Sequence, residues 1–373
     1  MIFQNDLETL LGVESGYEQE LSECVHANEA FFRRFDGRSF LVSGAAGLIG
    51  SYLIDLLIQA HRELGIVVRV FACDRNGDLL KRRFPDVFTD VVQRCVLDIC
   101  TGTLPAERVD YIIHAASNTS PKDYATRPID TIRTNMQGLD RLCEFAVSHK
   151  VRRFLQCSSV EVYGRNNGDT DFFAEDYSGY VDCNTVRACY PSAKRCAETL
   201  CNAYATEHPE FNFVIARIGR IYGPTALLSD SKAMTQFLLN AARGEDIVLK
   251  SDGTQLYSWC YVADCAMALL TLLLDGLFGE AYNVADPESC CTLREFAETV
   301  ASAVGRKVVF CSMTSAEHAA YSTISKATLN VEKLSALGWR AYTSLADGVR
   351  KTIEQLYKSL NVNSTSEKHT KAK

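Results

Sequence analysis

A short apolar segment, a glycine-rich turn and a helical segment follow one another near residue 40, and together they restrict the folds open to this chain. Phe40–Val42 has the character of a buried strand, and the apolar residues of Leu48–Ala60 recur at helical spacing. Gly44, Gly47 and Gly50 lie at or between these segments, three residues apart. A strand that turns tightly into a helix is typical of the first unit of a doubly wound α/β sheet.

The same turn has the features of a phosphate-binding site. The first glycine permits the tight turn, the second lets a pyrophosphate approach the backbone, and the third lets the helix pack closely. The N–H groups at the helix start, including those of Leu48 and Ile49, would face an anion together with the positive end of the helix dipole. The G-x-x-G-x-x-G spacing differs from the commoner G-x-G-x-x-G, so a turn without a ligand is the alternative.

Composition limits the classes of partner. The 373 residues suffice for one large or two ordinary domains, and 47% hydrophobic with 23% charged residues is typical of a soluble globular protein. A net charge of −7 without a long basic block argues against nucleic acid or an anionic membrane as a partner. The longest apolar segment, 266–274, is too short to span a bilayer.

The cysteines and the N-terminal residues favour a cytoplasmic protein. Fifteen cysteines are an odd number, none forms a C-x-x-C pair, and most lie in apolar segments. This is typical of reduced core residues rather than of disulfides or a zinc site, so we expect no metal. The first residues have neither the basic nor the apolar part of a signal peptide.

Further apolar segments predict more strands, each ending in residues suited to a dinucleotide. Val67–Cys73 ends at Asp74, whose carboxylate can accept hydrogen bonds from a ribose and would repel the 2′-phosphate of NADP. The alternative is an ordinary strand-end aspartate, and the neighbouring Arg75 weakens the argument. Gln93–Leu97 and Asp110–His114 come next, and the expected cofactor contacts after them are Asp98, Ile99, Ala115, Ala116 and Ser117. The alternation of strands with helices predicts a parallel sheet.

Four polar residues beside these strands complete the expected cofactor and catalytic positions. For His114, a satisfied core histidine is a better interpretation than a catalytic one. A long helix is expected at 129–150, with Asn135 near its start, and a fifth strand at 151–157. In an extended continuation of that strand, Ser159 and Glu161 would share one face at the carboxyl end of the sheet, where ligands bind. The polar loop 165–188 that follows could cover a substrate.

Tyr190 and Lys194 lie four residues apart in a helical segment that continues to Tyr204, so both occupy one face of the helix. A nearby ammonium lowers the pKa of a phenol, which would make Tyr190 an acid or base near neutral pH. Such pairs are common by chance. The upstream serine and the glycine turn make chance a poor explanation here.

These residues give the chain a family resemblance. It resembles the extended short-chain dehydrogenases/reductases that act on nucleotide sugars, from Leu41 to about Arg350. The shared motifs are Ser43-Gly44-x-x-Gly47-x-x-Gly50, Asp74, Asp98-Ile99, His114-Ala-Ala-Ser117, Asn135, Ser159, Tyr190-x-x-x-Lys194, Arg217 with Tyr222-Gly223-Pro224, Tyr261-Val262-x-Asp264 and Leu337-Gly338-Trp339.

Within this group the chain is most similar to the UDP-glucuronate decarboxylases, the UDP-xylose synthases. The similarity is carried by Arg187-Ala-Cys-Tyr190 with the helix after it, by Ala116-Ser117-x-x-Ser120-Pro121-x-x-Tyr124, and by Glu161. The resemblance implies NAD as cofactor and a nucleotide-diphosphate sugar as substrate. It implies catalytic roles for Ser159, Glu161, Tyr190 and Lys194, of which the last two also contact the cofactor, and substrate contacts from Ser120, Tyr124, Arg217, Arg220 and Tyr257.

Three positions depart from the family pattern. Ser159 stands where the family has Thr, Arg220 where it has Asn, and Tyr257 where it has an Arg that contacts the substrate diphosphate and supports decarboxylation. Tyr cannot replace the bidentate phosphate contact of a guanidinium. Arg220 could substitute for it from the other side of the pocket. Val160, after the hydroxyl residue, argues against a dehydratase, which carries Asp-Glu there.

The mechanism implied by the resemblance is oxidation and reduction in one site. Tyr190 would remove the proton of a sugar 4-hydroxyl while C4 gives a hydride to NAD. Lys194 would lower the pKa of Tyr190 and hold the nicotinamide ribose. Ser159 would bind the oxygen of the developing carbonyl. With a glucuronyl substrate the resulting β-keto acid loses carbon dioxide. The alternatives are a 4-epimerase, an NAD(P)H-dependent reductase of a keto sugar, and a non-catalytic dinucleotide-sensing module, against which the intact Ser159, Tyr190 and Lys194 argue.

The expected organisation is two domains with extensions. Residues 1–38, with Leu7, Leu10 and Leu11 at helical spacing, are expected to form a helical extension that packs on the main domain or on a partner. Residues 39–217 with return segments near 255–287 would form a NAD-binding Rossmann domain, 218–254 and 288–357 a smaller substrate-binding domain, and 358–373 a disordered tail. The resemblance also implies a homodimer through helices 129–150 and 190–204, with Leu139, Leu142, Phe145, Leu200 and Tyr204 available for burial.

Overall fold

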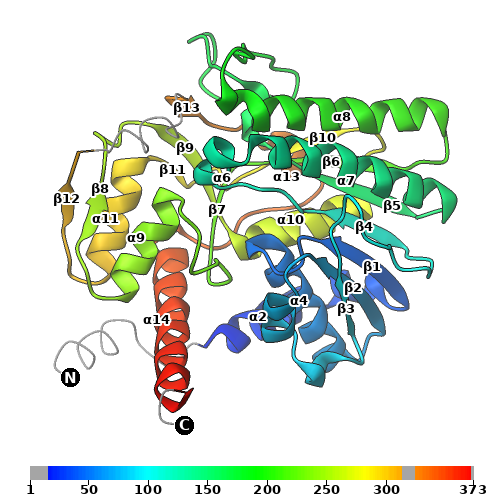
Figure 1. The fold of residues 1–373 in the computed structure, drawn as a ribbon, viewed down its shortest axis with the longest axis horizontal. Helices are drawn as coiled ribbons and strands as arrows, with labels where there is room; N and C mark the ends of the chain where they lie inside the picture. Colours follow the sequence, from blue (N-terminus) through cyan, green and yellow to red (C-terminus); the bar gives the residue numbers. More distant parts are fainter. Residues whose placement is uncertain (1–15, 313–323, 371–373) are drawn as a thin grey trace.

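The chain is built around one seven-stranded sheet in which neighbouring strands are parallel (Figure 1). The computed structural model describes residues 16–312 and 324–370. The strands in spatial order are β10 (Ala281–Val284), β6 (Phe213–Ile218), β5 (Arg153–Ser159), β4 (Tyr111–His114), β1 (Arg38–Ser43), β2 (Val68–Asp74) and β3 (Val92–Val96). The direction in which strands are added reverses between β1 and β4, which creates a crevice at their carboxyl ends.

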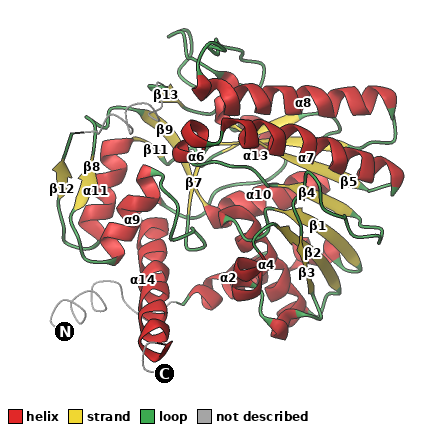
Figure 2. Ribbon diagram, in the orientation of Figure 1, coloured by secondary structure: helices red, strands yellow, loops and turns green. Residues whose placement is uncertain are grey.

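Helices cover both faces of this sheet (Figures 1 and 2). α4 (Leu48–Leu64) and α10 (Val262–Asp275) contribute to one apolar core, and α7 (Pro128–Ser148) and α8 (Cys189–Glu207) contribute to the other. Strands covered on both sides bury every residue, as β4 does, and therefore have the continuous apolar sequence seen here. The predicted doubly wound α/β fold is confirmed. Short helices α3 (Glu29–Phe32), α5 (Gly77–Arg83) and α6 (Pro121–Thr126) lie in the connections.

A second group of elements lies beyond the carboxyl ends of β1 and β4 (Figure 1). Its four-stranded sheet consists of β7 (Arg220–Tyr222), β9 (Leu256–Tyr261), β11 (Cys290–Thr292) and β13 (Lys326–Ala327), and a two-stranded sheet of β8 (Ile247–Leu249) and β12 (Val308–Phe310). The helices are α9 (Ala233–Ala242), α11 (Leu293–Ala303), α13 (Glu332–Ser335) and α14 (Leu345–Thr370). β10 returns to the main sheet beside β6, as the sequence predicts.

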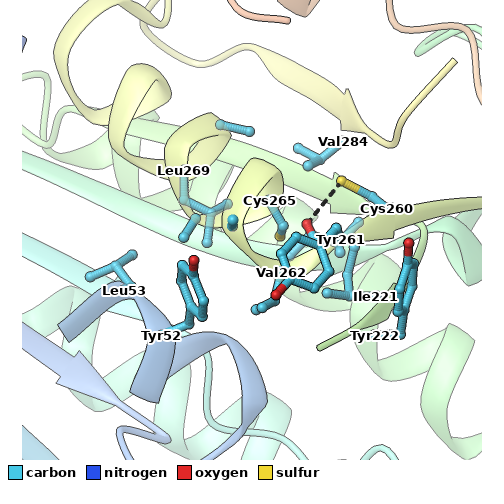
Figure 3. Close-up of a cluster of buried hydrophobic side chains, with 14 of the residues drawn as sticks. Tyr52, Leu53, Ile221, Tyr222, Cys260, Tyr261, Val262, Cys265, Leu269 and Val284 are labelled. Carbon is cyan, nitrogen blue, oxygen red and sulfur yellow. Dashed lines mark hydrogen bonds between the residues drawn. The ribbon is translucent and has the colours of Figure 1, made fainter. Parts of the chain in front are cut away.

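The N-terminal helix α2 (Tyr17–Ala27) connects the two groups of elements. It packs on α4, and its Glu20 carboxylate accepts hydrogen bonds from the hydroxyls of Tyr52 on α4 and Tyr261 at the end of β9. The ammonium of Lys351 on α14 lies 3.5 Å from the same carboxylate. Figure 3 shows Tyr52 and Tyr261 within the apolar cluster between α4 and α10. The predicted Leu7, Leu10 and Leu11 lie outside the described residues.

Two helix boundaries and the burial of three side chains differ from the sequence prediction. Residues 61–64 form the last turn of α4, beyond the helical segment 48–60 expected from the sequence, because Gly65 ends the helix with φ of 67°. α14 continues to Thr370, so the predicted disorder of 358–373 is wrong for 358–370, since a helix already started adds a hydrogen bond with each residue. Leu139 and Leu142 are fully buried, and Phe145 nearly so, within the α7–α8 core of one chain. These three side chains are therefore unavailable to a partner subunit.

No helix in the described part of the chain has both the length and the apolar character needed to cross a bilayer.

All fifteen cysteines are free thiols.

Candidate active site

The glycine turn between β1 and α4 has the close backbone packing that a dinucleotide site requires. Gly44 has φ of 70°, and a Cβ there would lie 2.8 Å from the backbone nitrogen of Ala116. A Cβ at Gly50 would lie 2.5 Å from the carbonyl oxygen of Gly44. No side chain caps the N-terminus of α4 at Gly47. The turn therefore leaves a concave backbone surface at a helix N-terminus, which fits the pyrophosphate of NAD.

Asp74 supports this turn directly. Its Oδ2 accepts a hydrogen bond from the backbone N–H of Ala46 at 3.3 Å, and its Oδ1 accepts one from Asn76 at 3.0 Å. The neighbouring Arg75 donates to the side chain of Asn118 at 3.1 Å and so is turned toward the loop after β4. Asp74 thus lies at the rim of the glycine turn, where the sequence analysis places a ribose.

Two residues expected to contact the cofactor have side chains with other partners. Ile99 is buried, and it packs against α7 so tightly that a Cβ at Gly138 would lie 2.6 Å from its methyl group. Its side chain therefore belongs to the core, because Gly138 leaves room for it there. Asp98 accepts a hydrogen bond from the backbone of Cys100 at 2.8 Å and closes a turn. Leu48 and Ile49 lie in the first turn of α4, as expected.

The segment after β4 is fixed by polar contacts. His114 is fully buried, and its Nδ1 lies 2.7 Å from the hydroxyl of Ser43, which also accepts from the backbone N–H of Ala116 at 3.3 Å. Ser117 and Asn135 exchange hydrogen bonds at 3.1 and 3.2 Å. Ala115 and Ala116 are small residues beside Gly44, so they let the two backbones approach.

His114 matches the prediction of a core histidine only in part, because its Nε2 is buried without a hydrogen-bond partner in the described part of the chain. Burial first, and the charge of Lys194 second, lower the pKa of His114 to about 3. The histidine is therefore neutral in the folded protein at physiological pH.

This gives a testable pH dependence. A histidine in the unfolded chain has a pKa near 6.5. Between about pH 6.5 and 3, His114 is therefore protonated in the unfolded chain and neutral in the folded protein. The free energy of unfolding decreases as the pH falls through this range. From pH 6 to pH 4, wild type should lose roughly 2 kcal/mol more free energy of unfolding than His114→Gln. Urea unfolding at both pH values measures this, and equal losses in the two proteins would contradict the assignment.

The segment after β5 differs from the prediction. Residues 160–163 form a 3₁₀ helix rather than an extended continuation, and Ser159 caps it by accepting a hydrogen bond from the backbone N–H of Glu161 at 3.3 Å. The alternation that would place Ser159 and Glu161 on one face of a strand is therefore wrong. The turn nevertheless keeps both residues near Tyr190, since the hydroxyl of Ser159 and the charge of Glu161 both act on that phenol.

Tyr190 and Lys194 occupy the first turns of α8, and both are buried. Burial, with the negative charge of Glu161, raises the pKa of Tyr190 to about 12, whereas the Ser159 hydrogen bond and the charges of Arg220 and Arg187 act to lower it. The Lys194 ammonium donates to the carbonyl oxygen of Cys157 at 2.7 Å. It lies 5.8 Å from the Tyr190 ring centroid, and burial lowers the pKa of Lys194 to about 8. The lowered pKa that the sequence analysis expected for Tyr190 is therefore not found, because burial outweighs Ser159 and the two arginines, and Lys194 is not among the groups that act on this phenol.

Charged and aromatic side chains continue from Tyr190 toward the second group of elements. The ring of Tyr124 stacks on that of Tyr190 with centroids 5.0 Å apart, and the guanidinium of Arg187 lies 4.8 Å from the centroid of the Tyr124 ring. Arg187 donates to both oxygens of the buried Glu161 carboxylate at 2.8 Å. Arg220 lies 3.7 Å from Glu161 on the other side and 4.7 Å from the ring centroid of Tyr257. Arg187 is a site residue that the sequence analysis missed, although it belongs to the quoted motif.

Two expected substrate-binding residues lie outside this cluster. Arg217 directs its donors to the Glu198 carboxylate, to the Tyr163 hydroxyl and to the carbonyl oxygen of Glu175, so its guanidinium is fully used inside the protein. Ser120 shares a hydrogen bond of 2.8 Å with Ser231, from the second group of elements. A β-strand position cannot reveal such pairings, because they depend on which segments the fold brings together.

The loop 165–188 is anchored rather than free to cover a substrate. Phe173 forms a bridge with Leu329, and the Asn283 side chain donates to the carbonyl oxygen of Phe173 at 2.9 Å. The Asn283 side chain also accepts from the Tyr163 hydroxyl at 2.5 Å. These contacts tie the loop to β10 and to the segment after β13.

Comparisons with known proteins identify the family of this chain. Residues 40–285 match the NAD dependent epimerase/dehydratase family. UDP-glucuronic acid decarboxylase 1 of Danio rerio is 30% identical over 88% of this chain and 75% of its own length. UDP-glucuronic acid decarboxylase 6 of Arabidopsis thaliana is 34% identical over 73% of this chain and 76% of its own.

A solved structure shows the same fold. The UDP-glucuronic acid 4-epimerase of Bacillus cereus, in complex with UDP-glucuronic acid and NAD, superposes with a TM-score of 0.70 at 20% identity, over 86% of this chain and 99% of the epimerase. The family match covers the strand–turn–helix unit, the Tyr190–Lys194 pair and the return strand β10. This chain therefore belongs to the NAD-dependent epimerase/dehydratase family, whose members are enzymes.

Proposed function

We propose that this enzyme modifies a nucleotide-diphosphate sugar through a transient 4-keto intermediate, and that its reaction is the decarboxylation of UDP-glucuronate. The observation that carries the proposal is the buried Tyr190, which has the hydroxyl of Ser159 as a neighbour and is followed one turn later by Lys194. The similarity to UDP-glucuronic acid decarboxylases over most of the chain supports the choice of substrate.

The protein side chains have separate tasks in this proposal. Bound NAD supplies the hydride acceptor and donor. Tyr190 takes and returns the proton of the sugar 4-hydroxyl, and Ser159 donates a hydrogen bond to the oxygen that becomes a carbonyl. Lys194 places a positive charge at the carboxyl end of β5, held by the Cys157 carbonyl. Glu161 is paired with Arg187, so its part is to position that arginine and the neighbouring Arg220 rather than to transfer a proton.

A 4-epimerase is the second candidate. Tyr257 stands where the family has an arginine that supports decarboxylation, so the carboxylate could remain on the sugar while the hydride returns to the other face. The name of the Bacillus cereus relative, a UDP-glucuronic acid 4-epimerase, gives this candidate a precedent on the same fold.

The deciding experiment incubates purified protein and NAD with a panel of nucleotide sugars and follows products by mass spectrometry. UDP-glucuronate that loses 44 mass units, the mass of carbon dioxide, would support decarboxylation. An unchanged mass with altered stereochemistry would support epimerisation, and a gain of two hydrogens from added NADH would support reduction. Failure of every nucleotide sugar to react would contradict the proposed function.

The carboxylate of Asp74 should make the site selective for NAD. We expect Asp74→Asn, which keeps the acceptor for Ala46 and removes the charge, to improve NADP affinity about tenfold relative to NAD because a 2′-phosphate no longer meets an anion. Calorimetric titration of both proteins with both dinucleotides tests this. Equal NADP and NAD affinities in wild type would mean that Arg75 dominates the pocket.

We also propose a cytoplasmic homodimer. The exposed faces of α7 and α8 would meet their copies, with the half-buried Leu200 and Tyr204 at the edge of the contact. Light scattering that gives the mass of a single chain at micromolar concentration would contradict the dimer.

A further inference from the structure

The guanidinium of Arg220 is the least satisfied charge near Tyr190. In the described part of the chain its contacts are the 3.7 Å ion pair with Glu161 and the stacking over Tyr257. Neither contact is a hydrogen bond of normal length, so the five donors of a guanidinium have room for a ligand. A quarter of the side chain is exposed, and burial of the rest would oppose its charge unless an anion faces it.

The local charges do not balance. Glu161 is a single carboxylate between two guanidiniums, because Arg187 bonds both of its oxygens and Arg220 approaches one of them. The Nε atom of Arg187 is itself buried without a partner in the described residues. The cluster thus has one positive charge in excess, together with unused donors, in a mostly buried setting.

The strand pairing fixes the direction of Arg220. Arg220 pairs with Trp259 in the parallel contact of β7 with β9, and Tyr257 precedes Trp259 by two residues, on the same face of β9. The Tyr257 ring is almost fully buried beneath the guanidinium. One face of Arg220 is therefore covered by Tyr257, and its edge remains available on the side of Glu161 and Tyr190.

The place of Arg220 selects the part of the substrate that it can reach. Arg220 shares Glu161 with Arg187, whose guanidinium lies over the ring of Tyr124, and that ring stacks on Tyr190. Arg220 therefore lies in the cluster around the proposed position of the reacting carbon. In a hexose the C6 carbon is attached to C5, the neighbour of C4, whereas the diphosphate is attached to C1 across the ring. An anion close to both C4 and Arg220 is therefore a C6 carboxylate.

We propose that Arg220, stacked on Tyr257 and aligned by Glu161, binds the carboxylate of the sugar and makes the enzyme specific for carboxylate-bearing nucleotide sugars. The inference rests on the proposed function and adds the residue that sets the substrate class. A bidentate guanidinium–carboxylate contact is planar, which suits an arginine whose plane is already fixed by an aromatic ring.

The test compares two ligands that differ at C6. UDP-glucuronate and UDP-glucose would be titrated calorimetrically into NAD-saturated wild type and Arg220→Gln. We expect Arg220→Gln to lower the affinity for UDP-glucuronate about 10- to 100-fold, because a charged hydrogen-bonded contact is lost. The affinity for UDP-glucose should change less than about threefold. Equal weakening of both ligands would place Arg220 on the diphosphate and overturn the inference, as would no change in either.

Matched variants separate this from a folding effect. Arg294→Gln removes a guanidinium of α11 that stacks on Phe310 at a comparable 5.0 Å and donates to the carbonyl oxygen of Asp252, and it should alter the affinity for neither ligand. Tyr257→Leu keeps Arg220 but removes the aromatic ring on which it stacks, and should lower the affinity for UDP-glucuronate more than that for UDP-glucose. If Tyr257→Leu kept the wild-type ratio of UDP-glucuronate to UDP-glucose affinity, the Tyr257 ring would not be what orients Arg220. Wild type that binds neither ligand would overturn the proposed function, and wild type that binds both equally would overturn this inference alone.

Discussion

Replacing Tyr190 by Phe should lower turnover by about 10²–10⁴-fold, the usual contribution of a positioned acid–base group. The variant keeps the ring that stacks on Tyr124 and removes the hydroxyl that faces Ser159. The fold should be little affected, because the ring still fills its place and Ser159 keeps its hydrogen bond from the backbone N–H of Glu161. NAD affinity should also stay close to that of wild type, since the glycine turn is untouched.

Turnover of the reactive nucleotide sugar measures this effect. The melting temperature and an NAD titration check that the fold and the NAD affinity are unchanged. Tyr204→Phe is the matched control, because it removes a hydroxyl from the same helix that bonds Asp140 at 2.6 Å, on the far side from Ser159. It should lose stability of roughly 1 kcal/mol and keep full turnover. If Tyr190→Phe retained more than about a tenth of wild-type turnover, Tyr190 would be a packed aromatic and not the proton shuttle.

The second large effect is expected at the glycine turn. Gly44→Ala should abolish measurable NAD binding at concentrations that saturate wild type. The left-handed backbone costs an alanine about 1–2 kcal/mol. In addition, the new Cβ would meet three backbone atoms of Ala115 and Ala116 at 2.8–2.9 Å, and backbone cannot move aside as a flexible side chain can. The turn must then open against the segment that follows β4.

Gly65→Ala isolates the conformational part of this effect from the steric part. Gly65 has φ of 67°, close to the 70° of Gly44, but a Cβ there would meet no atom within 4 Å. It should therefore show the conformational cost of about 1–2 kcal/mol in unfolding experiments while NAD affinity stays unchanged. Equal NAD affinities for Gly44→Ala and Gly65→Ala would show that the turn does not hold the dinucleotide.

Much of the site could be predicted from the sequence because its signals are local. The glycine spacing, the strand-end Asp74 and the four-residue separation of Tyr190 and Lys194 each follow from the geometry of one turn, one strand or one helix. The fold class followed in the same way, since apolar strands alternating with helices have few compact arrangements. These predictions needed no knowledge of which segments meet.

Predictions that depended on partners were less successful. Ser159 and Glu161 were placed by strand alternation, but a 3₁₀ helix begins at Val160. The lowering of the Tyr190 pKa expected from Lys194 is absent, because burial raises this pKa and the groups that oppose the rise, Ser159, Arg187 and Arg220, reach Tyr190 from other elements. Arg217 has the charge expected of a substrate contact, yet Glu198 on α8 holds it inside the protein.

The sequence by itself determined the α/β fold, the glycine turn and the Tyr190–Lys194 pair, because short-range backbone geometry and hydrophobic periodicity are written in neighbouring residues. Only the tertiary structure decided that Arg220 stacks on Tyr257 and shares Glu161 with Arg187, and that Glu20 of α2 meets Tyr52 and Tyr261. These contacts join residues up to 241 positions apart. Charges and hydrogen bonds act through space, so their partners are set by the packing of the elements and not by their order in the chain.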